Sequence, residues 1–503
     1  MRRRILAVVA LIAVAAAVTL AVARPSPAGA PKRPNIVFVL TDDLSWNLVR
    51  YMPHVVGLER QGVTFSHYYV TDSLCCPSRS SIFGGKFPHD THVFSNKGKD
   101  GGFRAFHRRG EESSTFATSL QAAGYRTAMM GKYLNGYMPL QPVNGKPLYV
   151  PPGWNEWDVA GNAYPEFNYV LNENGRAVNY GNSPQDYLVD VMAGKAVNFI
   201  NGAASAKKPF AIELATFAPH KPYTPAPRYA AAFPGLAAPR TPAFDFANLN
   251  PPRWLSGHAP LTPPQVFDID TSFRKRVQAV QAVDDMIARI ESTLKARHLD
   301  KNTYIVFSSD NGYHMGEHRL LPGKMTAFDT DINVPLVIAG PGVPRGKTLA
   351  QIAENVDLRP TFSVLGGAHV PATVEGHSLV PLLRGGKQPA VWRNAALVEH
   401  HGPDFQKGDP DLPGPGSGNP RTYEALRDNH AVYVEYSDGE RGYYDLTRDP
   451  YELNNVYSKL GSKQRARLHA QLVAMAACHG GSRCWAAQGG SGIRARPGSV
   501  ARP

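Results

Sequence analysis

The stretch NIVFVL at residues 35–40 decides the fold, and the residues TDD at 41–43 follow it directly. A continuous apolar run of this length is typical of a strand that is buried on both faces of a parallel sheet. Three more such runs occur at residues 126–130, 210–217 and 303–308, and each leads into polar residues. In open α/β sheets, ligands bind outside the carboxyl ends of the strands. Four strands that end in this way predict a functional site at one edge of an α/β sheet.

The rest of the chain predicts flanking helices and a second, antiparallel sheet. Residues 271–298 carry apolar side chains at helical spacing, at positions 280, 283, 287, 290 and 294. Residues 334–339 are a further expected strand, whereas 222–262 and the Gly/Pro/Asp-rich segment 402–419 are expected loops. Residues 396–399, 431–436 and 441–446 alternate like strands, and 462–477 is an expected helix. We expect a main domain at 31–370, a smaller antiparallel-sheet domain at 371–485 and a flexible tail at 486–503.

The composition fits a folded protein with an anionic partner. Of the 503 residues, 43% are hydrophobic and 19% are charged, which excludes a disordered chain. The net charge is +13, and the first thirty residues hold four arginines and no acid, so the remainder carries +9. This balance suits an anionic substrate or a polyanion without choosing between them. Four cysteines are too few for a disulfide scaffold, although Cys478 and Cys484 could close a small loop in an exported protein.

The chain begins with the pattern of a signal peptide at residues 1–30. Three arginines at 2–4 precede an apolar run at 5–23, and Ala-Gly-Ala at 28–30 is a pattern that a signal peptidase could cleave. An uncleaved membrane anchor is the alternative, because the run is longer than the usual signal core. No later segment is apolar for long enough to span a membrane. We therefore expect a secreted or cell-envelope protein with no stable membrane span after signal removal.

The stretch LCCPSRSS at residues 74–81 carries the most informative motif, Cys-x-Pro-Ser-Arg from Cys75 to Arg79. Here the chain resembles the sulfatase family, whose maturation signal is this pentapeptide. The resemblance runs from Pro34 to about Tyr457. It implies an alkaline-phosphatase-like α/β fold, with a central mixed, mostly parallel sheet flanked by helices and a smaller C-terminal domain with an antiparallel sheet.

The resemblance also implies a modified residue at position 75. In the family this cysteine is oxidised to formylglycine (3-oxoalanine) by a formylglycine-generating enzyme, and Arg79 would hold it. One hydroxyl of the hydrated aldehyde attacks sulfur and displaces the alcohol, and the other then expels sulfate and restores the aldehyde. A serine could perform only the first half of this cycle. The alternative is that Cys75 and Cys76 are ordinary buried thiols, which is common for cysteine.

Oxygen-bearing residues at two strand ends predict a metal site. Asp42 and Asp43 follow the first strand, and Asp310 and Asn311 follow the run at 303–308. Carboxylate and amide oxygens suit a hard divalent cation. The resemblance implies that these four residues bind calcium together with the side chain at Cys75. Taken singly, either pair is common turn or capping chemistry.

Three basic residues complete the expected catalytic site. Lys132 follows one buried run, His220 follows another, and Lys324 ends the sequence LPGK at 321–324. Charge builds on the bridging oxygen of a sulfate ester as its bond breaks, so the site needs fixed positive charge and a proton donor. The resemblance implies that Lys132 and Lys324 contact sulfate oxygens and that His220 helps to protonate the leaving alcohol. Taken singly, such residues are more often surface lysines or structural histidines.

One departure narrows the resemblance to a branch of the family. Many sulfatases carry histidine two residues after the lysine, and Leu134 occupies that position here. The sequence GKYLN at 131–135 resembles the branch of N-acetylglucosamine-6-sulfatases and extracellular heparan 6-O-endosulfatases. Asn135 is expected to replace the hydrogen bond of that histidine and to bind substrate, while Asp310 or a water molecule accepts the proton. His314 is a second candidate substrate-binding residue, with a polar loop as the alternative.

These features favour a secreted, calcium-dependent sulfuric ester hydrolase that acts on a sulfated sugar of the N-acetylglucosamine 6-sulfate type. Two alternatives use the same features. A phosphonate or phosphodiester hydrolase would share the nucleophile and the metal ligands, and a non-catalytic binder of sulfated polymers would use the +9 charge that remains after the first thirty residues. Nucleic acid is not an expected partner, because the basic residues are dispersed and the sequence holds no recognition motif.

Overall fold

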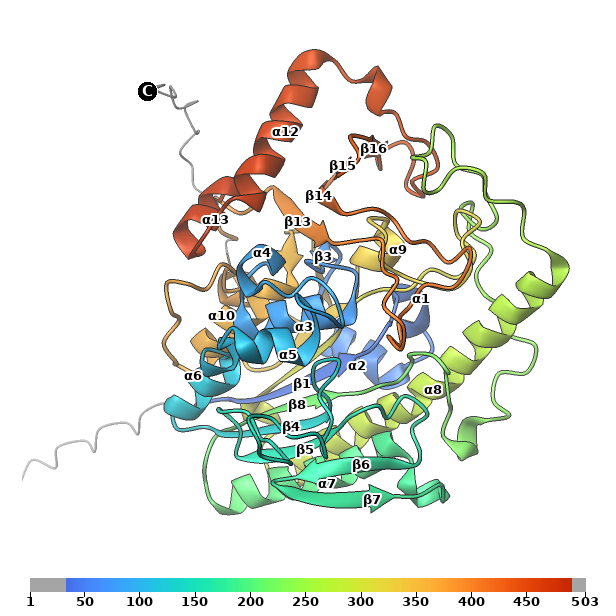
Figure 1. Cartoon of the computed structure of the whole chain (residues 1–503). Coiled ribbons are helices and arrows are strands. Elements are labelled where there is room, and N and C mark those ends of the chain that lie inside the picture. Colours follow the sequence, from blue (N-terminus) through green and yellow to red (C-terminus); the bar gives the residue numbers. More distant parts are fainter. Residues whose placement is uncertain (1–32, 387, 491–503) are drawn as a thin grey trace, which may run out of the picture. The chain divides into compact units, whose positions relative to one another are not determined.

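The structure is a computed structural model that describes residues 33–386 and 388–490, so the expected signal peptide lies outside the described residues. Its two larger sheets have ten and four strands (Figure 1). The strands are β1 (Asn35–Thr41), β2 (Val63–Phe65), β3 (Tyr68–Tyr69), β4 (Arg126–Lys132), β5 (Glu156–Ala160), β6 (Tyr169–Glu173), β7 (Arg176–Tyr180), β8 (Phe210–Ala215), β9 (Thr303–Ser309), β10 (Leu336–Ala339), β11 (Lys347–Leu349), β12 (Ala353–Glu354), β13 (Ala395–His400), β14 (Tyr423–Asp428), β15 (Ala431–Tyr436) and β16 (Arg441–Asp445). The α-helices are α1 (Trp46–Val49), α2 (Pro53–Gln61), α3 (Cys75–Gly84), α4 (Pro88–Thr91), α5 (Gly102–Arg108), α6 (Phe116–Ala122), α7 (Leu188–Ser205), α8 (Pro263–Ala296), α9 (Asp329–Ile332), α10 (Leu358–Leu365), α11 (Val380–Leu383), α12 (Ser462–Ala476) and α13 (Gly481–Ala487).

The ten-stranded sheet is mixed, with its parallel strands at the centre. Its order is β11-β2-β10-β9-β1-β8-β4-β5-β6-β7, in which β9, β1, β8, β4 and β5 run parallel. Strands β10, β6 and β7 pair antiparallel with their neighbours. The four runs expected to be buried strands form β1, β4, β8 and β9, which are adjacent in the order β9-β1-β8-β4. Their carboxyl ends therefore meet at one edge of the sheet.

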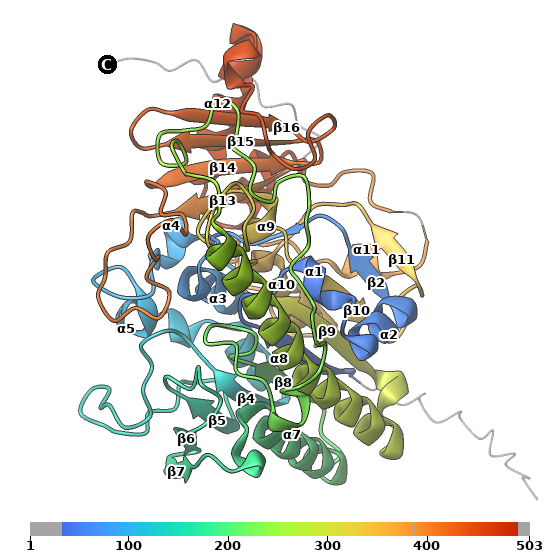
Figure 2. The ribbon, with the colours of Figure 1, turned by 90° about the vertical axis from the view of Figure 1, so that its right-hand side faces the viewer.

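Helices cover both faces of this sheet (Figure 2). Successive side chains of a strand point to opposite faces, and those of β1 enter two different cores. Ile36 and Phe38 lie in the core that includes residues of α3, α6 and α10, whereas Val37 and Val39 lie in the core with α7 and α8. The predicted fold class, a mixed and mostly parallel sheet flanked by helices, is confirmed.

The long helix α8 begins eight residues earlier than its apolar pattern predicts. All five apolar positions predicted for it are buried, and they pack in the core with α7. The earlier start has a local cause: the Thr262 backbone N–H donates to Gln265 Oε1 over 2.9 Å, and two prolines occupy the first turn. Proline suits that turn because its missing N–H has no helical acceptor there.

The C-terminal sheet has the predicted antiparallel form, in the order β13-β14-β15-β16. Its second strand, β14, was not expected, because the sequence YEALRD at 423–428 has the composition of a helix rather than of a strand. Helix α12 packs against β13 and β14, and Cys478 is disulfide-bonded to Cys484 beyond it. None of the helices within residues 33–386 and 388–490 is both long enough and apolar enough to cross a membrane.

Candidate active site

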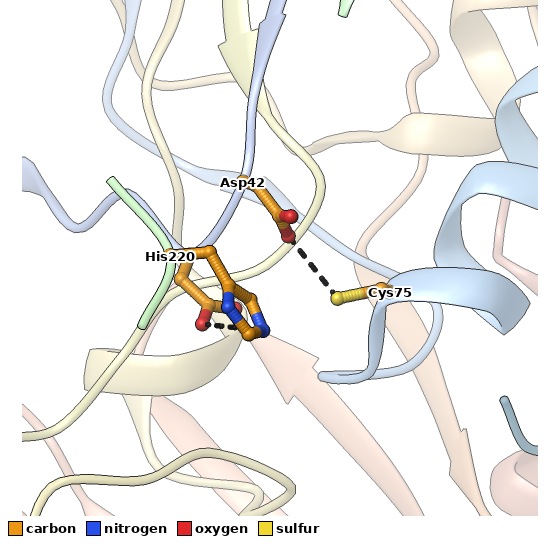
Figure 3. A group of neighbouring side chains, drawn as sticks. Asp42, Cys75 and His220 are labelled. Carbon is orange, nitrogen blue, oxygen red and sulfur yellow. Dashed lines mark hydrogen bonds and ion pairs between the residues drawn. The ribbon is translucent and has the colours of Figure 1, made fainter. Parts of the chain in front are cut away.

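Four adjacent strands and one helix bring the expected site residues together. Asp42 directly follows β1, Lys132 is the last residue of β4, and His220 lies five residues beyond β8. Asp310 directly follows β9, and Cys75 is the first residue of α3. Figure 3 shows the Asp42 carboxylate and the Cys75 thiol pointing toward each other, with the His220 ring beside them. These residues, far apart in the sequence, thus form one cluster at the sheet edge.

Cys75 lies at the bottom of this cluster and is fully buried. Its thiol donates to Asp42 Oδ1 over 3.2 Å, and Lys324 Nζ donates to its sulfur over 2.9 Å. Burial, together with the nearby carboxylates, raises the pKa of the Cys75 thiol well above its usual range. The thiolate is the nucleophilic form of cysteine, so an unmodified Cys75 is a poor nucleophile at neutral pH. Cys76, next to it, belongs instead to the hydrophobic core.

Arg79 fixes the geometry around Cys75 from one helical turn further along α3. Its guanidinium is buried, and Nε donates to Asp310 Oδ2 over 2.7 Å. Nη1 donates to the Lys132 carbonyl over 2.9 Å, and Nη2 lies 3.9 Å from Asp42 Oδ1. A planar guanidinium with several donors is suited to holding carboxylates in one orientation. Arg79 therefore connects three of the four strand ends.

The expected metal ligands form a compact set of oxygen atoms. Asn311 Nδ2 donates to Asp43 Oδ1 over 2.7 Å, and the Asp43 backbone N–H donates to Asp310 Oδ1 over 3.2 Å. Asn311 Oδ1 is buried and has no hydrogen-bond partner among the described residues. Ligand atoms of Asp42, Asp43, Cys75 and His220 also lie within 4.8 Å of one another. Buried carboxylates beside an unpartnered amide oxygen fit a hard divalent cation such as calcium.

Asp43 adopts a backbone conformation that non-glycine residues rarely adopt. Its φ is +64°, and its carbonyl accepts a hydrogen bond from Arg276 of α8. Such strained residues cluster at functional sites, where the surrounding structure holds them in place. Asp43 and its neighbour Asp42 both lie in the cluster.

Asp310 is held as a carboxylate. Burial alone raises the pKa of Asp310, but Arg79, Lys132 and Lys324 outweigh it and lower that pKa to about 2. A carboxylate with so low a pKa is a weak base. Asp42, rather than Asp310, contacts the Cys75 sulfur. The structure therefore disfavours Asp310, one of the two expected proton acceptors, in that role.

Lys132 and Lys324 supply fixed positive charge near Cys75. Lys132 Nζ lies 2.5 Å from Asp42 Oδ2, and Lys324 Nζ lies 2.6 Å from Asp43 Oδ1. Burial lowers the pKa of each lysine, but the neighbouring carboxylates outweigh it and raise both values well above the usual range. Both ammonium groups therefore stay charged at neutral pH, as binding of a sulfate group requires.

His220 has the electrostatic surroundings of a proton donor. Its Nδ1 donates to the Lys221 carbonyl over 2.7 Å, and its Nε2 lies 3.6 Å from Asp43 Oδ2. Burial lowers the pKa of His220, but Asp43, Asp411 and Asp42 outweigh it and raise that pKa above its usual value. A raised pKa favours the protonated ring, whose Nε2 carries a proton that it can give to a leaving group.

The two expected substrate-binding residues lie in different surroundings. Asn135 Nδ2 donates to the Tyr164 hydroxyl over 3.3 Å, and Asn135 lines a cavity of about 290 Å³ with Tyr164. His314 is only 1% exposed. Its Nδ1 lies 3.0 Å from Asp331, and its Nε2 lies 3.0 Å from the Ser417 carbonyl. Both ring nitrogens of His314 are therefore engaged with protein in this structure.

Sequence reasoning missed one residue of the cluster, Asp411. It comes from the expected loop at 402–419, and its Oδ1 lies 2.6 Å from His220 Nε2 and 2.7 Å from Lys324 Nζ. Its side chain is only 2% exposed. The one available signal was a pair of aspartates on either side of Pro410, in the sequence DPDLP at 409–413 of a long loop. Such loops often carry function, but nothing in the run points to a partner.

A cavity opens from the cluster toward solvent. Its volume is about 330 Å³, and its lining includes Asp43, His220, Tyr223, Lys324 and Asp411. Ligand pockets for small molecules begin at about 300 Å³. The cavity is therefore large enough for a sugar residue whose charged group reaches the buried cations.

The fold and the site together define a class of protein: an enzyme with a mixed α/β sheet whose edge carries a buried set of carboxylates and cations beside a pocket, an arrangement suited to an anionic ester. The sulfatase family profile matches residues 34–368, and the chain belongs to that family. A second profile, that of the C-terminal region of N-sulphoglucosamine sulphohydrolase, matches residues 316–477.

Individual relatives sharpen this assignment. Human N-acetylglucosamine-6-sulfatase is 34% identical over 482 residues, which cover 90% of this chain and 86% of the human protein. An extracellular sulfatase homologue of Drosophila melanogaster is 36% identical over 393 residues, which cover 75% of this chain and 34% of that protein. A solved structure of a protein in complex with its substrate, D-glucosamine-2-N,6-O-disulfate, shares the fold, with a TM-score of 0.73 at 24% identity over 88% of this chain and 97% of that one. The chain is a sulfatase that resembles N-acetylglucosamine-6-sulfatases over most of its length.

Proposed function

We propose that this sulfatase removes the 6-O-sulfate of an N-acetylglucosamine residue in a sulfated glycan, with formylglycine formed from Cys75 and with bound calcium. The observation that carries the proposal is the similarity to human N-acetylglucosamine-6-sulfatase over 90% of the chain. The buried cluster around Cys75 is compatible with the required chemistry, because it combines carboxylates for a cation with lysines for a sulfate group.

In the proposed site, Asp42, Asp43, Asp310 and Asn311 would hold calcium. When bound, calcium supplies positive charge that polarises the sulfate group and favours ionisation of the hydrated aldehyde. Arg79 fixes Asp310 and the end of β4, and thereby orients both the ligand set and Lys132. A preorganised set of this kind stabilises developing charge without rearrangement during the reaction.

The remaining residues act on the substrate. Lys132 and Lys324 bind the non-bridging sulfate oxygens, because both ammonium groups are buried and lie near Cys75. His220 Nε2 gives its proton to the oxygen at carbon 6 of the sugar as the bond to sulfur breaks. The sugar itself occupies the cavity of about 330 Å³ beyond His220 and Lys324.

Two measurements test the proposal. Mass spectrometry of the tryptic peptide at residues 61–79, from protein secreted by its own host, should show an aldehyde in place of the Cys75 thiol. The matured enzyme should then release sulfate from N-acetylglucosamine 6-sulfate faster than from an aryl sulfate, and faster than it cleaves an aryl phosphonate. Faster turnover of the phosphonate would instead favour the phosphorus-ester alternative.

We also propose that the protein is exported, in line with the signal-peptide pattern and with the extracellular relatives. N-terminal sequencing of the secreted protein should begin at Pro31. A secreted or envelope-bound form that still begins at the N-terminal arginines would show that the segment is an anchor.

A further inference from the structure

Asp411 occupies the place that the proposed function gives to the substrate's sulfate group. Its Oδ1 lies at hydrogen-bond distance from both the proposed proton donor, His220 Nε2, and the proposed sulfate-binding Lys324 Nζ, at 2.6 and 2.7 Å. Its Oδ2 lies 3.5 Å from the Cys75 sulfur. A substrate oxygen must reach these same three groups. The carboxylate and the sulfate group therefore cannot bind there at the same time.

Contacts of the loop at 402–419 hold the Asp411 carboxylate in this position. It leaves β13 of the C-terminal sheet and descends toward the ten-stranded sheet (Figure 2). Asn96 Nδ2 donates to Asp411 Oδ2 over 2.6 Å and to Asp409 Oδ1 over 3.2 Å. The Asp411 backbone N–H also donates to Asp409 Oδ1, over 2.9 Å. Pro410, between the two aspartates, lines both the cavity beyond His220 and the cavity beside Asn135.

The charges in the pocket favour replacement of the Asp411 carboxylate by the sulfate ester over binding of both anions together. Three permanent cations, Arg79, Lys132 and Lys324, face the carboxylates of residues 42, 43, 310 and 411 in one buried cluster. Coulomb interactions between buried groups are strong, so a second anion beside Asp411 would be repelled. A sulfate ester and the Asp411 carboxylate each carry a single negative charge. Replacing one with the other leaves the buried charge unchanged.

We propose that Asp411 alternates with sulfate in this pocket: it neutralises Lys324 and His220 in the resting enzyme, yields its place to the substrate's sulfate ester, and returns to help release the product. Free sulfate carries two negative charges, so Lys132, Lys324 and His220 attract it more strongly than they attract the ester. A carboxylate that moves back onto Lys324 and His220 competes for the same donors. The proposal rests on the proposed position of sulfate between Lys132, Lys324 and His220, and it makes Asp411 a determinant of anion affinity rather than of bond cleavage.

The test measures binding without turnover. Inorganic sulfate is titrated calorimetrically into the full chain carrying Cys75→Ala, which needs no maturation and performs no hydrolysis. The same titration is made with Asp411→Asn added, since an amide keeps the shape and the acceptor oxygen but removes the charge. Loss of a like charge within hydrogen-bond distance of the same donors should tighten sulfate binding by about tenfold or more. Asp100→Asn, added to Cys75→Ala instead, is the charge-matched control: its exposed carboxylate lies 3.7 Å from His401 Nδ1, outside the cluster, and the sulfate affinity of this variant should stay within about twofold.

Each result decides the question. Tighter binding with Asp411→Asn, and not with Asp100→Asn, supports the exchange. Equal or weaker binding with Asp411→Asn overturns it, because Asp411 would then assist the anion or lie apart from it. Absence of sulfate binding in all three proteins also overturns it. Because none of these outcomes involves hydrolysis, a failure of the proposed 6-O-sulfatase activity would be seen separately, in the turnover assays.

Discussion

Two clusters in this molecule both combine histidine and carboxylate side chains, but they differ in their surroundings. In the first, ligand atoms of Asp42, Asp43, Cys75 and His220 lie within 4.8 Å of one another, and those of His89, Asp90, Glu375 and His479 do so in the second. The first cluster is fully buried, whereas the second is partly exposed. The difference that matters is what faces each of them.

Beside the active-site cluster lie three permanent cations, Arg79, Lys132 and Lys324, and a buried amide oxygen, Asn311 Oδ1, that has no hydrogen-bond partner among the described residues. The second cluster is satisfied by its own His479–Asp90 pair, by Glu399 outside it and by backbone groups. His89 Nδ1 lies 2.9 Å from Glu399, and His89 Nε2 lies 2.8 Å from the Cys478 carbonyl. Glu375 accepts the Phe87 and Gly480 backbone N–H groups. Residue types alone therefore do not make a site: permanent cations and an unpartnered amide oxygen beside the carboxylates distinguish the first cluster from the second, which connects α4 with the disulfide-bonded Cys478.

The largest expected effect comes from position 75. Cys75→Ala should abolish sulfate release, because the variant cannot form the aldehyde, and it should leave the melting temperature nearly unchanged. Cys76→Ala is the matched control: it should mature and turn over normally while losing about 1 kcal/mol of stability from the core. The two variants are compared by sulfate release and by thermal unfolding. Residual activity in Cys75→Ala would remove the basis for a formylglycine mechanism.

Removal of the metal should have the next largest effect, and it should show which of the two clusters binds the metal that activity requires. Dialysis against a calcium chelator should abolish turnover and destabilise the protein, because the carboxylates of Asp42, Asp43 and Asp310 would then repel one another. Added calcium should restore both properties. His479→Gln should leave the calcium concentration needed for half-maximal activity unchanged. A shift in that concentration would show that the second cluster also binds the metal that activity requires.

Loss of one cation from the active site should have a smaller effect than either. Lys132→Ala should lower kcat/KM by about 100- to 1000-fold, the range for removal of one preorganised charge-stabilising group. Lys86→Ala is the control, since Lys86 pairs with Glu111 over 2.9 Å outside the site, and its turnover should match that of the parent. A Lys132 variant with nearly full activity would place the sulfate group elsewhere.

The sequence predicts the strand-end residues of the active-site cluster, but it does not predict the residue that the loop at 402–419 contributes. The apolar runs predict the four central strands. Because the carboxyl ends of parallel strands meet at one edge of a sheet, the runs also predict that Asp42, Lys132 and Asp310 lie close together. The contact between Asp411 and His220 joins residues 191 positions apart. It depends on the path of a loop that has no repeating pattern, which is why sequence reasoning missed it.

The histidines show the same limit. The sequence of a polar loop does not show whether the ring nitrogens of its histidine are free or hydrogen-bonded. His314 was therefore a candidate for substrate binding. In the structure Asp331 and the Ser417 carbonyl engage that ring. Likewise, nothing in the sequence connects His89 with Glu399 in β13. Such pairings depend on how the C-terminal sheet packs against α4, and no local rule specifies that.

The smallest expected effect lies in the second cluster and depends on pH. Burial lowers the pKa of His89, but Glu399, Glu375 and the Cys478 carbonyl outweigh it and raise that pKa from 6.5 to about 9. Because the folded-state pKa is the higher one, the stabilisation is fully present below pH 6.5 and is lost as the pH rises through about 9. His89→Gln should therefore cost about 1–3 kcal/mol of unfolding free energy at pH 6 and much less at pH 10, as measured by urea unfolding. His479→Gln, at a mostly exposed ring, should cost under about 0.5 kcal/mol at either pH. Equal losses for His89→Gln at both pH values would mean that its ring contributes packing rather than charge, and the second cluster would then resemble the hydrophobic core more than the active site.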